Sequence, residues 1–313
     1  MTGLLKRPWF GPLVALIAVY VLFAALSPDT FLGATNLATM ARQTVVVAVV
    51  AVGMTMIIVQ GGIDLSVGSG VALTTVVVAS LLRTGAGPWA AAMAGILAST
   101  AAGLLTGLLV TRLRVTPFII TLGGMSVMRG LAKGIAGEQK IDADPRGLDA
   151  LLAPPSQAWM LLPPGVWVAL VIAVMAGAML TYTRLGRHIL AVGSNEQTAR
   201  LCGIDVARVR LLVYVIAAAL TGVGGVMEFS TLTVGDPTDS LGLELEVIAA
   251  VVIGGGSLSG GEGSIRGTLI GALLMTVIKT GATHLGLPNW VQEIVTGAII
   301  VGAVALDRVR RKR

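Results

Sequence analysis

The chain has 313 residues, of which 55% are hydrophobic and 12% charged, and its mean hydropathy is +0.89. Soluble domains carry about 25% charged residues, so this composition excludes a soluble protein and places most side chains in lipid. The net charge of +6 does not indicate nucleic acid, because the positive residues lie in loops and the tail, where they orient the chain and meet anionic headgroups. The single cysteine, Cys202, excludes disulfide frameworks and cysteine metal sites.

A bilayer core about 30 Å thick needs about 20 apolar residues per helix. The sequence therefore predicts an all-α polytopic membrane protein with about ten transmembrane helices, in which residues 1–313 form a single transmembrane domain. The first apolar run resembles a signal peptide, but its length and the runs that follow favour a retained helix. The predicted spans are 9–27, 41–59, 65–82, 88–110, 117–135, 159–182, 211–231, 244–256, 265–285 and 289–306.

Lysine and arginine gather on one side of this topology. With ten spans both termini share that side, and the positive-inside rule makes it cytoplasmic. The polar segment 137–157 then lies outside, where it either meets a partner or stays hydrated. The basic residues of the cytoplasmic side are Lys6, Arg7, Arg112, Arg114, Arg184, Arg187, Arg200, Arg208, Arg210, Arg308, Arg310, Arg311, Lys312 and Arg313.

Two glycine-rich clusters, 60–70 and 254–264, interrupt the hydrophobic runs. In the first, glycines release the preceding helix, and Asp64 or Ser66 can cap the next helix by accepting its free N–H groups. The functional alternative for Asp64 is a polar turn that lines or gates a path. Elsewhere, three Gly-x-x-x-Gly pairs predict close helix packing. They are Gly103 with Gly107, Gly130 with Gly134, and Gly267 with Gly271.

Ionisable residues inside the predicted spans cost several kcal/mol unless they are paired or hydrated. They should therefore face the bundle interior, a water-filled path or the membrane interface, and mutual ion pairing is the simplest role. Ion coupling is less favoured, because the two glutamates lie toward the outer ends of their spans rather than at mid-membrane. These residues are Arg129, Lys133, Glu228, Lys279 and Glu293.

The long basic loop 183–210 contains a short predicted helix. Its sequence supplies a capping box, an acid at the positive helix start, a base at the negative end and a glycine for a left-handed exit. About eight residues cannot form a stable helix alone in water, so this helix must pack against its own protein or a partner. The simpler alternative is a plain loop with a chance cap. The marking residues are Ser194, Gln197, Glu196, Arg200 and Gly203.

Catalytic patterns are missing from the sequence. The two histidines, His188 and His284, lie apart, and neither metalloprotease spacing nor a Gly-x-Ser-x-Gly turn with triad partners occurs. The chain contains no Gly-Lys dipeptide, so it has no phosphate-binding P-loop. We therefore expect a non-enzymatic protein that binds no cofactor of its own.

Four stretches together resemble the membrane permease subunits of bacterial ABC importers for monosaccharides, the ribose, xylose and galactose group. The sequence departs slightly from the family pattern at Thr198, Cys202 and Gly256, which bears on the sugar more than on the function. The stretches are GGIDLSVGSG at 61–70, TPFIITLGGMSVMRGLA at 116–132, GSNEQTARLCGIDV at 193–206 and LELEVIAAVVIGGGSLSGGEGS at 243–264.

The resemblance implies a multi-pass protein of the inner membrane that acts with several partners. These are ATPase subunits that hold ATP and magnesium, a periplasmic or lipid-anchored substrate-binding protein, and a second copy or sister permease, in contact with membrane lipid. It also implies that the helix 194–203 fits a groove on the ATPase. The implied coupling residues are Ser194, Asn195, Glu196, Ala199, Arg200 and Gly203.

Moderate, transient contacts suit the transport of a neutral polyol, so hydroxyls near the fifth span are candidates for the path. The candidates are Thr121, Ser126, Arg129 and Asp64, although ordinary helix packing explains the hydroxyls equally well. The alternative function is an ion-coupled secondary transporter, which would show internal inverted repeats that we do not see. Related permeases carry nucleosides, furanoses or branched-chain amino acids, so the sequence leaves the solute open.

Overall fold

The computed structural model describes residues 9–113, 115–154 and 162–311. Five of the basic residues assigned above to the cytoplasmic side lie outside the described residues, as do residues 155–161 at the end of the polar segment and the start of the sixth predicted span. The described part is helical, apart from two strands of two residues each, so the chain is an all-α polytopic membrane protein. The five basic residues are Lys6, Arg7, Arg114, Lys312 and Arg313.

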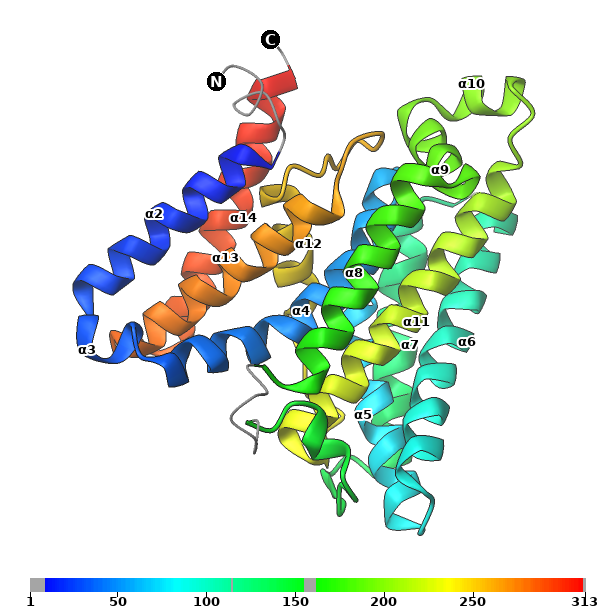
Figure 1. The fold of residues 1–313 in the computed structure, drawn as a ribbon. Coiled ribbons are helices and arrows are strands. Elements are labelled where there is room, and N and C mark those ends of the chain that lie inside the picture. Colours follow the sequence, from blue (N-terminus) through cyan, green and yellow to red (C-terminus); the bar gives the residue numbers. More distant parts are fainter. Residues whose placement is uncertain (1–8, 114, 155–161, 312–313) are drawn as a thin grey trace.

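Ten helices follow the ten predicted spans in order and run alternately up and down the molecule (Figure 1). They are α2 (Phe10–Leu26), α4 (Ala34–Val59), α5 (Val67–Arg83), α6 (Pro88–Leu113), α7 (Pro117–Ala136), α8 (Pro164–Tyr182), α11 (Val206–Leu232), α12 (Leu243–Ile253), α13 (Ile265–His284) and α14 (Asn289–Arg311). The shorter elements are α3 (Pro28–Phe31), β1 (Ile141–Asp142), η1 (Leu148–Leu151), α9 (Arg184–Ser194), α10 (Glu196–Leu201) and β2 (Val234–Gly235).

Among the described residues, six helices are long and apolar enough to cross a membrane, namely α4, α6, α7, α8, α11 and α13. The eighth predicted span, 244–256, corresponds to α12, which has only 11 residues. At a rise of 1.5 Å per residue it is about 16 Å long, roughly half of the hydrocarbon core. The non-helical residues 236–242 precede it.

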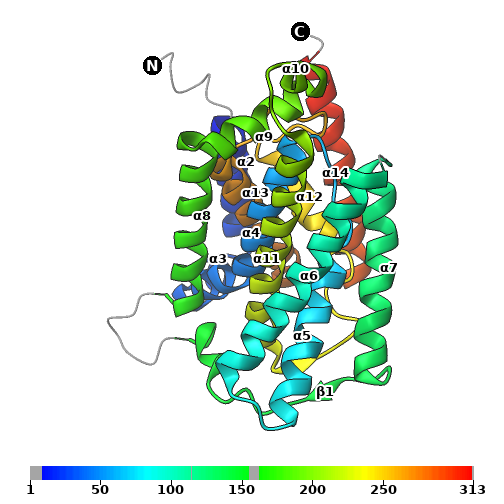
Figure 2. The ribbon, with the colours of Figure 1, turned by 90° about the vertical axis from the view of Figure 1, so that its right-hand side faces the viewer.

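The two ends of the bundle differ in charge. The short helices α9 and α10, the start of α2 and the end of α14 all lie at one end, which we call the basic end (Figure 1). The opposite end carries α3, β1 and the turn between α5 and α6 (Figures 1 and 2). The basic end corresponds to the predicted cytoplasmic face.

The centre of the bundle is formed by α4 and α11. The stretch from Val45 to Val59 in α4 is buried on every side, as its uninterrupted apolar sequence requires. Helix α11 packs against α4, α5 and α6. At Gly103 and Gly107 of α6 an added Cβ would press on Ala218 and Tyr214 of α11, so this predicted close packing is confirmed.

The other two glycine pairs differ in outcome. At Gly267 and Gly271 of α13 a Cβ would overlap the backbone of Gly254 and Ala250, which confirms the predicted packing against the end of α12. A Cβ added at Gly130 or Gly134 would meet no atom within 4 Å, so the prediction for this pair is wrong within the described chain. The reason is the place of α7, which stands at the edge of the molecule (Figure 2).

At the opposite end, the polar segment is tied to the segment that precedes α12. Strands β1 and β2 pair antiparallel, with Ile141 opposite Gly235 and Asp142 opposite Val234. Beside this pair the Lys140 ammonium lies 3.0 Å from the Asp236 carboxylate. The polar segment is therefore partly built into the fold rather than fully surrounded by water.

Candidate functional site

The basic loop 183–210, called the basic segment below, contains two short helices, where the sequence predicted one. Helix α9 continues through Ser194, and the extended backbone of Asn195 separates it from α10. The Asn195 side chain accepts a hydrogen bond from the Thr198 N–H at 2.9 Å. The predicted capping box of Ser194 and Gln197 is therefore wrong, because α9 incorporates Ser194 and the adjacent asparagine, an equally good cap, takes its place.

The exit of α10 follows the prediction. Gly203 has a φ of +80°, and its N–H donates to the Arg200 carbonyl while the Ile204 N–H donates to that of Ala199. This pattern closes the helix with a left-handed residue that glycine adopts without steric cost. The side chain of Ala199 is buried against the bundle, so it anchors α10 and is not itself a contact surface.

Glu196 joins α10 to α11. Its carboxylate lies 2.6 Å from the guanidinium of Arg200 and 2.6 Å from that of Arg210. The hydrogen bond from Arg200, assisted by the charge of Arg210, lowers the pKa of Glu196. A lowered pKa means that this stabilisation is present above the ordinary pKa of glutamate and is lost as the pH falls through the lowered value.

At the end of α10 the apolar side chain of Leu201 is 88% exposed. This apolar side chain projects from a helix that is fixed by a cap and by ion pairs. Asn195, Ser194 and Arg200 are exposed on the same helix pair.

Behind this helix pair, three backbone segments meet through glycines. The Gly261 N–H donates to the Val59 carbonyl at 2.8 Å, which joins the end of α4 to the loop between α12 and α13. A Cβ on Gly193 would overlap the Val59 carbonyl, so only glycine permits this approach. Gly260, whose φ is +83°, contacts Gly193 in turn. We call Val59, Gly193, Gly260 and Gly261 the glycine junction.

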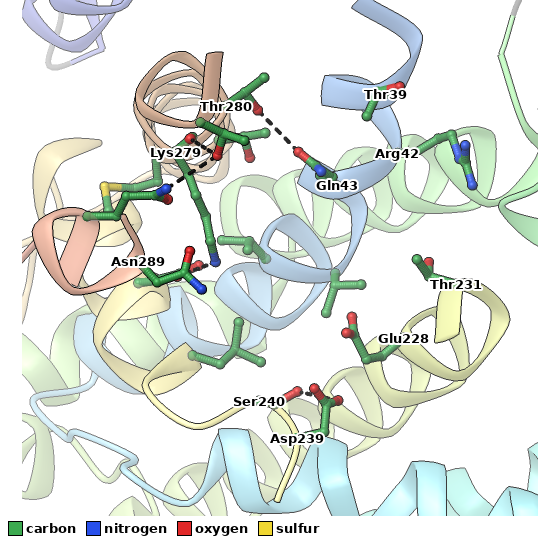
Figure 3. Close-up of a pocket in the computed structure, with 18 of the residues that line it drawn as sticks. Thr39, Arg42, Gln43, Glu228, Thr231, Asp239, Ser240, Lys279, Thr280 and Asn289 are labelled. Carbon is green, nitrogen blue, oxygen red and sulfur yellow. Dashed lines mark hydrogen bonds and ion pairs between the residues drawn. The ribbon is translucent and has the colours of Figure 1, made fainter. Parts of the chain in front are cut away.

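A polar cavity of about 740 Å³ lies at the other end of the same helices (Figure 3). Its walls come from α4, α11, α12, α13, α14 and the segment 236–242. The side chains are mostly hydroxyls, amides and charged groups. The lining polar residues are Asn36, Thr39, Arg42, Gln43, Glu228, Thr231, Asp239, Ser240, Glu246, Thr276, Lys279, Thr280, Thr283, His284, Asn289 and Gln292.

Charges of both signs face this cavity. The Lys279 ammonium lies 2.8 Å from the Glu246 carboxylate, and the Thr280 hydroxyl donates to the Gln43 side-chain oxygen at 3.1 Å. In the part of the chain that the structure describes, the Glu228 carboxylate has no hydrogen-bond or ion-pair partner, and the buried Nε of Arg42 has none either. These groups leave donors and acceptors available to a solute.

The segment 236–242 forms one wall of the cavity and is held from behind by α7. One guanidinium nitrogen of Arg129 donates to the carbonyls of Pro237 at 2.8 Å and of Asp239 at 2.7 Å. These bonds satisfy backbone carbonyls that no helix pairs. Arg129 therefore positions the cavity wall that carries Asp239 and does not itself line the cavity.

The other path candidates from the sequence also lie outside the lining of the cavity. The Thr121 hydroxyl is buried and donates to the carbonyls of Ile63 and Phe118, and Ser126 is exposed on α7. Asp64 is buried and accepts from the N–H and hydroxyl of Ser66. The sequence predicted that Asp64 or Ser66 caps α5, and this prediction is wrong, because neither side chain makes a cap hydrogen bond to that helix. The Asp64 carboxylate accepts from Ser66 instead.

Apart from Arg129, described above, the ionisable residues of the predicted spans form two groups. Glu228 and Lys279 line the cavity, as their place in apolar runs suggested, whereas Lys133 and Glu293 are exposed near the ends of α7 and α14. Sequence reasoning missed Gln43, Asp239 and Glu246, which lie close to the starts or ends of predicted spans. Among the described residues, no group of three or more His, Cys, Asp or Glu side chains could hold a metal ion.

Comparison with known proteins gives one consistent result. Residues 36–304 match the family model described as the permease component of the branched-chain amino acid transport system. The chain is 38% identical over 305 residues to the ribose import permease protein of Escherichia coli (strain K12), covering 96% of this chain and 93% of that protein.

Two further relatives carry other sugar names. The L-arabinose ABC transporter permease protein of Azospirillum brasilense is 37% identical over 94% of this chain and 86% of its own length. The D-allose transport system permease protein of Escherichia coli (strain K12) is 34% identical over 97% and 92%. No solved structure matches the chain.

Proposed function

Because the chain belongs to the family of permease components of branched-chain amino acid transport systems, we propose that it is the membrane permease of an ATP-driven importer for a monosaccharide or a similar small polar solute. It is a multi-pass protein of the inner membrane. Relatives named for ribose, L-arabinose and D-allose transport support a sugar as the solute. They favour this function over an ion-coupled secondary transporter.

The observation that carries the proposal is the polar cavity. A pyranose or furanose presents several hydroxyls and no charge, and it needs donors and acceptors rather than one strong counter-ion. The cavity offers hydroxyls, amides and both signs of charge, as in the neighbouring Gln43, Glu228 and Lys279. Contacts of this kind hold a solute without trapping it, which suits transport.

The permease needs partners that supply energy and solute. We place ATP and magnesium on a separate ATPase, and we expect a substrate-binding protein to deliver the solute at the opposite end from α10. A second permease copy or a sister permease completes the channel. The charge bias of the basic end supports its assignment to the cytoplasm, where the ATPase acts.

The segment 194–203 is the proposed contact with the ATPase. Support comes from a helix fixed at both ends, by the Asn195 cap and by Gly203, and from the exposed Leu201 between them. Ala199 contributes by anchoring this helix, and Glu196 by joining it to α11 through Arg210. The segment therefore receives force and carries out no chemistry.

Reconstitution into vesicles tests the function. The chain is combined with the ATPase and binding protein encoded beside it, and uptake of labelled ribose, L-arabinose and D-allose is measured with and without ATP. We expect uptake of one sugar to require all three components and ATP. Uptake by the chain alone, driven by a proton or sodium gradient, would instead support the secondary transporter.

The coupling role is tested on α10. Leu201→Asp together with Arg200→Glu should abolish solute-stimulated ATP hydrolysis while membrane insertion is unchanged. A control variant, Arg112→Glu, makes the same kind of charge change at the end of α6, outside the segment. A disulfide from Cys202 to a thiol in the ATPase groove should also form, and failure at several groove positions argues against this docking.

A further inference from the structure

A second cavity, of about 750 Å³, opens on the basic end between α8 and α13. Its walls are apolar side chains of these two helices, including Leu170, Val174 and Leu269. Val174 is 72% exposed, so this wall faces outward from the bundle, where α8 stands at its edge (Figure 2). The cavity is therefore a groove on the membrane-facing side.

The groove has the length of one half of a bilayer. Along α8 it extends from Leu170 to Tyr182, and this stretch of helix rises about 18 Å. Half of the hydrocarbon core is about 15 Å thick. An acyl chain entering at the basic end would therefore lie along the groove for its full depth.

Two arginines from different elements stand at the mouth of the groove. Arg187 belongs to α9 and Arg266 to α13, and both side chains are exposed. Within the part of the chain that the structure describes, neither has an ion pair or a side-chain hydrogen bond. By contrast, Arg200 and Arg210 share Glu196.

Aromatic side chains complete the mouth. Trp9 and Tyr182 line the same groove beside the arginines. Tryptophan and tyrosine favour the level of the headgroups, and arginine binds a phosphate through two parallel N–H donors. The groove thus combines cationic, aromatic and apolar side chains, which is complementary to a phospholipid with an anionic headgroup.

We propose that this groove is a binding site for an anionic phospholipid, with the headgroup phosphate between Arg187 and Arg266 and an acyl chain along α8 and α13. Each arginine near an anionic surface favours binding about fivefold, so the pair gives about 25-fold preference over a zwitterionic lipid. Because Arg187 lies on α9, which leads into segment 194–203, and Arg266 lies on α13, the bound lipid links α9 to a helix of the polar cavity.

The binding test uses the purified full chain without any transport partner. The protein is exchanged into mixed micelles containing equal amounts of phosphatidylglycerol and phosphatidylcholine with identical acyl chains, and retained lipid is counted by native mass spectrometry. We expect phosphatidylglycerol to be retained at least about tenfold more than phosphatidylcholine. An excess of inorganic phosphate should not displace it, because the acyl chain also contributes to binding; displacement would assign the site to a free anion and overturn the proposal.

The variant Arg187→Gln with Arg266→Gln should remove this preference. A matched control, Arg112→Gln with Arg184→Gln, removes the same charge from the basic end but leaves the groove intact, and its preference should stay. Equal loss in both pairs, or no loss in either, would show general charge attraction and overturn the site. Gly177→Leu fills the groove without changing charge and should also reduce retained lipid, which guards against a misfolded arginine variant.

Discussion

The two ends of this bundle are built in opposite ways. At the basic end the glycine junction brings three backbone segments into contact, with Gly193 against Val59 and Gly261 bonded to it. At the opposite end the same helices separate around a polar cavity in which the Glu228 carboxylate and the Arg42 Nε have no partner among the described residues. The tight end has no room to adjust, whereas the open end has groups free to rearrange.

Two helices, α4 and α13, connect the tightly packed end to the polar cavity. Helix α4 ends at the junction with Val59 and carries Gln43 in the cavity, and α13 follows the junction loop and carries Lys279. A tightly packed contact transmits displacement because packed interfaces shift between discrete arrangements rather than deform. Movement of α9 and α10 should therefore reach the cavity through α4 and α13.

The largest effect is expected from loosening the tight end. In Gly193→Ala the new Cβ meets the Val59 carbonyl and must push α9 away from α4. ATP-driven uptake should fall at least about tenfold, while binding to the ATPase persists. Gly297→Ala in α14 is the control, since its Cβ would meet no neighbouring element within 4 Å. Equal uptake in the two variants would show that close packing at the glycine junction is not needed for transport.

The next effect concerns the cavity wall. Arg129→Met removes two hydrogen bonds from a charged donor, to Pro237 and Asp239. Each such bond contributes about 1.5–3 kcal/mol, so the variant should lose about 3 kcal/mol of unfolding free energy, or roughly 6–12 °C in Tm. Thermal unfolding in detergent measures this. Lys133→Met, one turn along α7 and exposed, should leave Tm unchanged.

A smaller effect is expected from the ion pair in the cavity. Lys279→Met leaves the Glu246 carboxylate without its partner, and Glu246→Gln leaves the Lys279 ammonium without one. Each single change should lower uptake several-fold, and the double variant should recover part of it, with a coupling energy of about 1 kcal/mol. The pair is partly exposed, which limits the size. Strictly additive losses in this double-mutant cycle would mean that the two residues act separately.

The smallest effect distinguishes two neighbouring caps. Asn195→Ala should cost about 1 kcal/mol, because its side chain holds the Thr198 N–H, whereas Ser194→Ala should cost nearly nothing. Hydrogen exchange of the α10 amides should therefore become about fivefold faster in the first variant alone. A larger effect of Ser194→Ala than of Asn195→Ala would instead identify Ser194 as the cap, as the sequence pattern predicted.

The basic segment was the more predictable of the two regions, because its structure is local. The caps, the Glu196–Arg200 pair and the Gly203 exit lie within a few residues of each other, while the Glu196–Arg210 pair spans 14 residues. Two predictions were wrong, one helix in place of two and Ser194 in place of Asn195 as the cap. Both errors arose because the two residues cap equally well and the choice depends on where α9 ends. The end of α9 cannot be located from a single sequence, because this helix is stabilised by its packing against the bundle.

The cavity was predictable only where a charge interrupts an apolar run, as at Glu228 and Lys279. Its other residues come from six elements that are far apart in the sequence, and no local pattern joins Gln43 to Asp239. The hydroxyl of Thr121 was a plausible candidate, but helix periodicity alone cannot tell a hydroxyl facing a cavity from one bonded to a nearby carbonyl, here that of Ile63.

The short pairing of β1 with β2 ties the polar segment at the opposite end to the backbone that leads into the cavity wall. Lys140 and Ile141 lie in the polar segment, and their partners Asp236 and Gly235 lie at the start of the cavity wall and just before it. Any protein that presses on or lifts this segment pulls the same stretch of backbone that carries Asp239. The pairing therefore connects the surface of the opposite end mechanically to the backbone that forms the wall of the polar cavity.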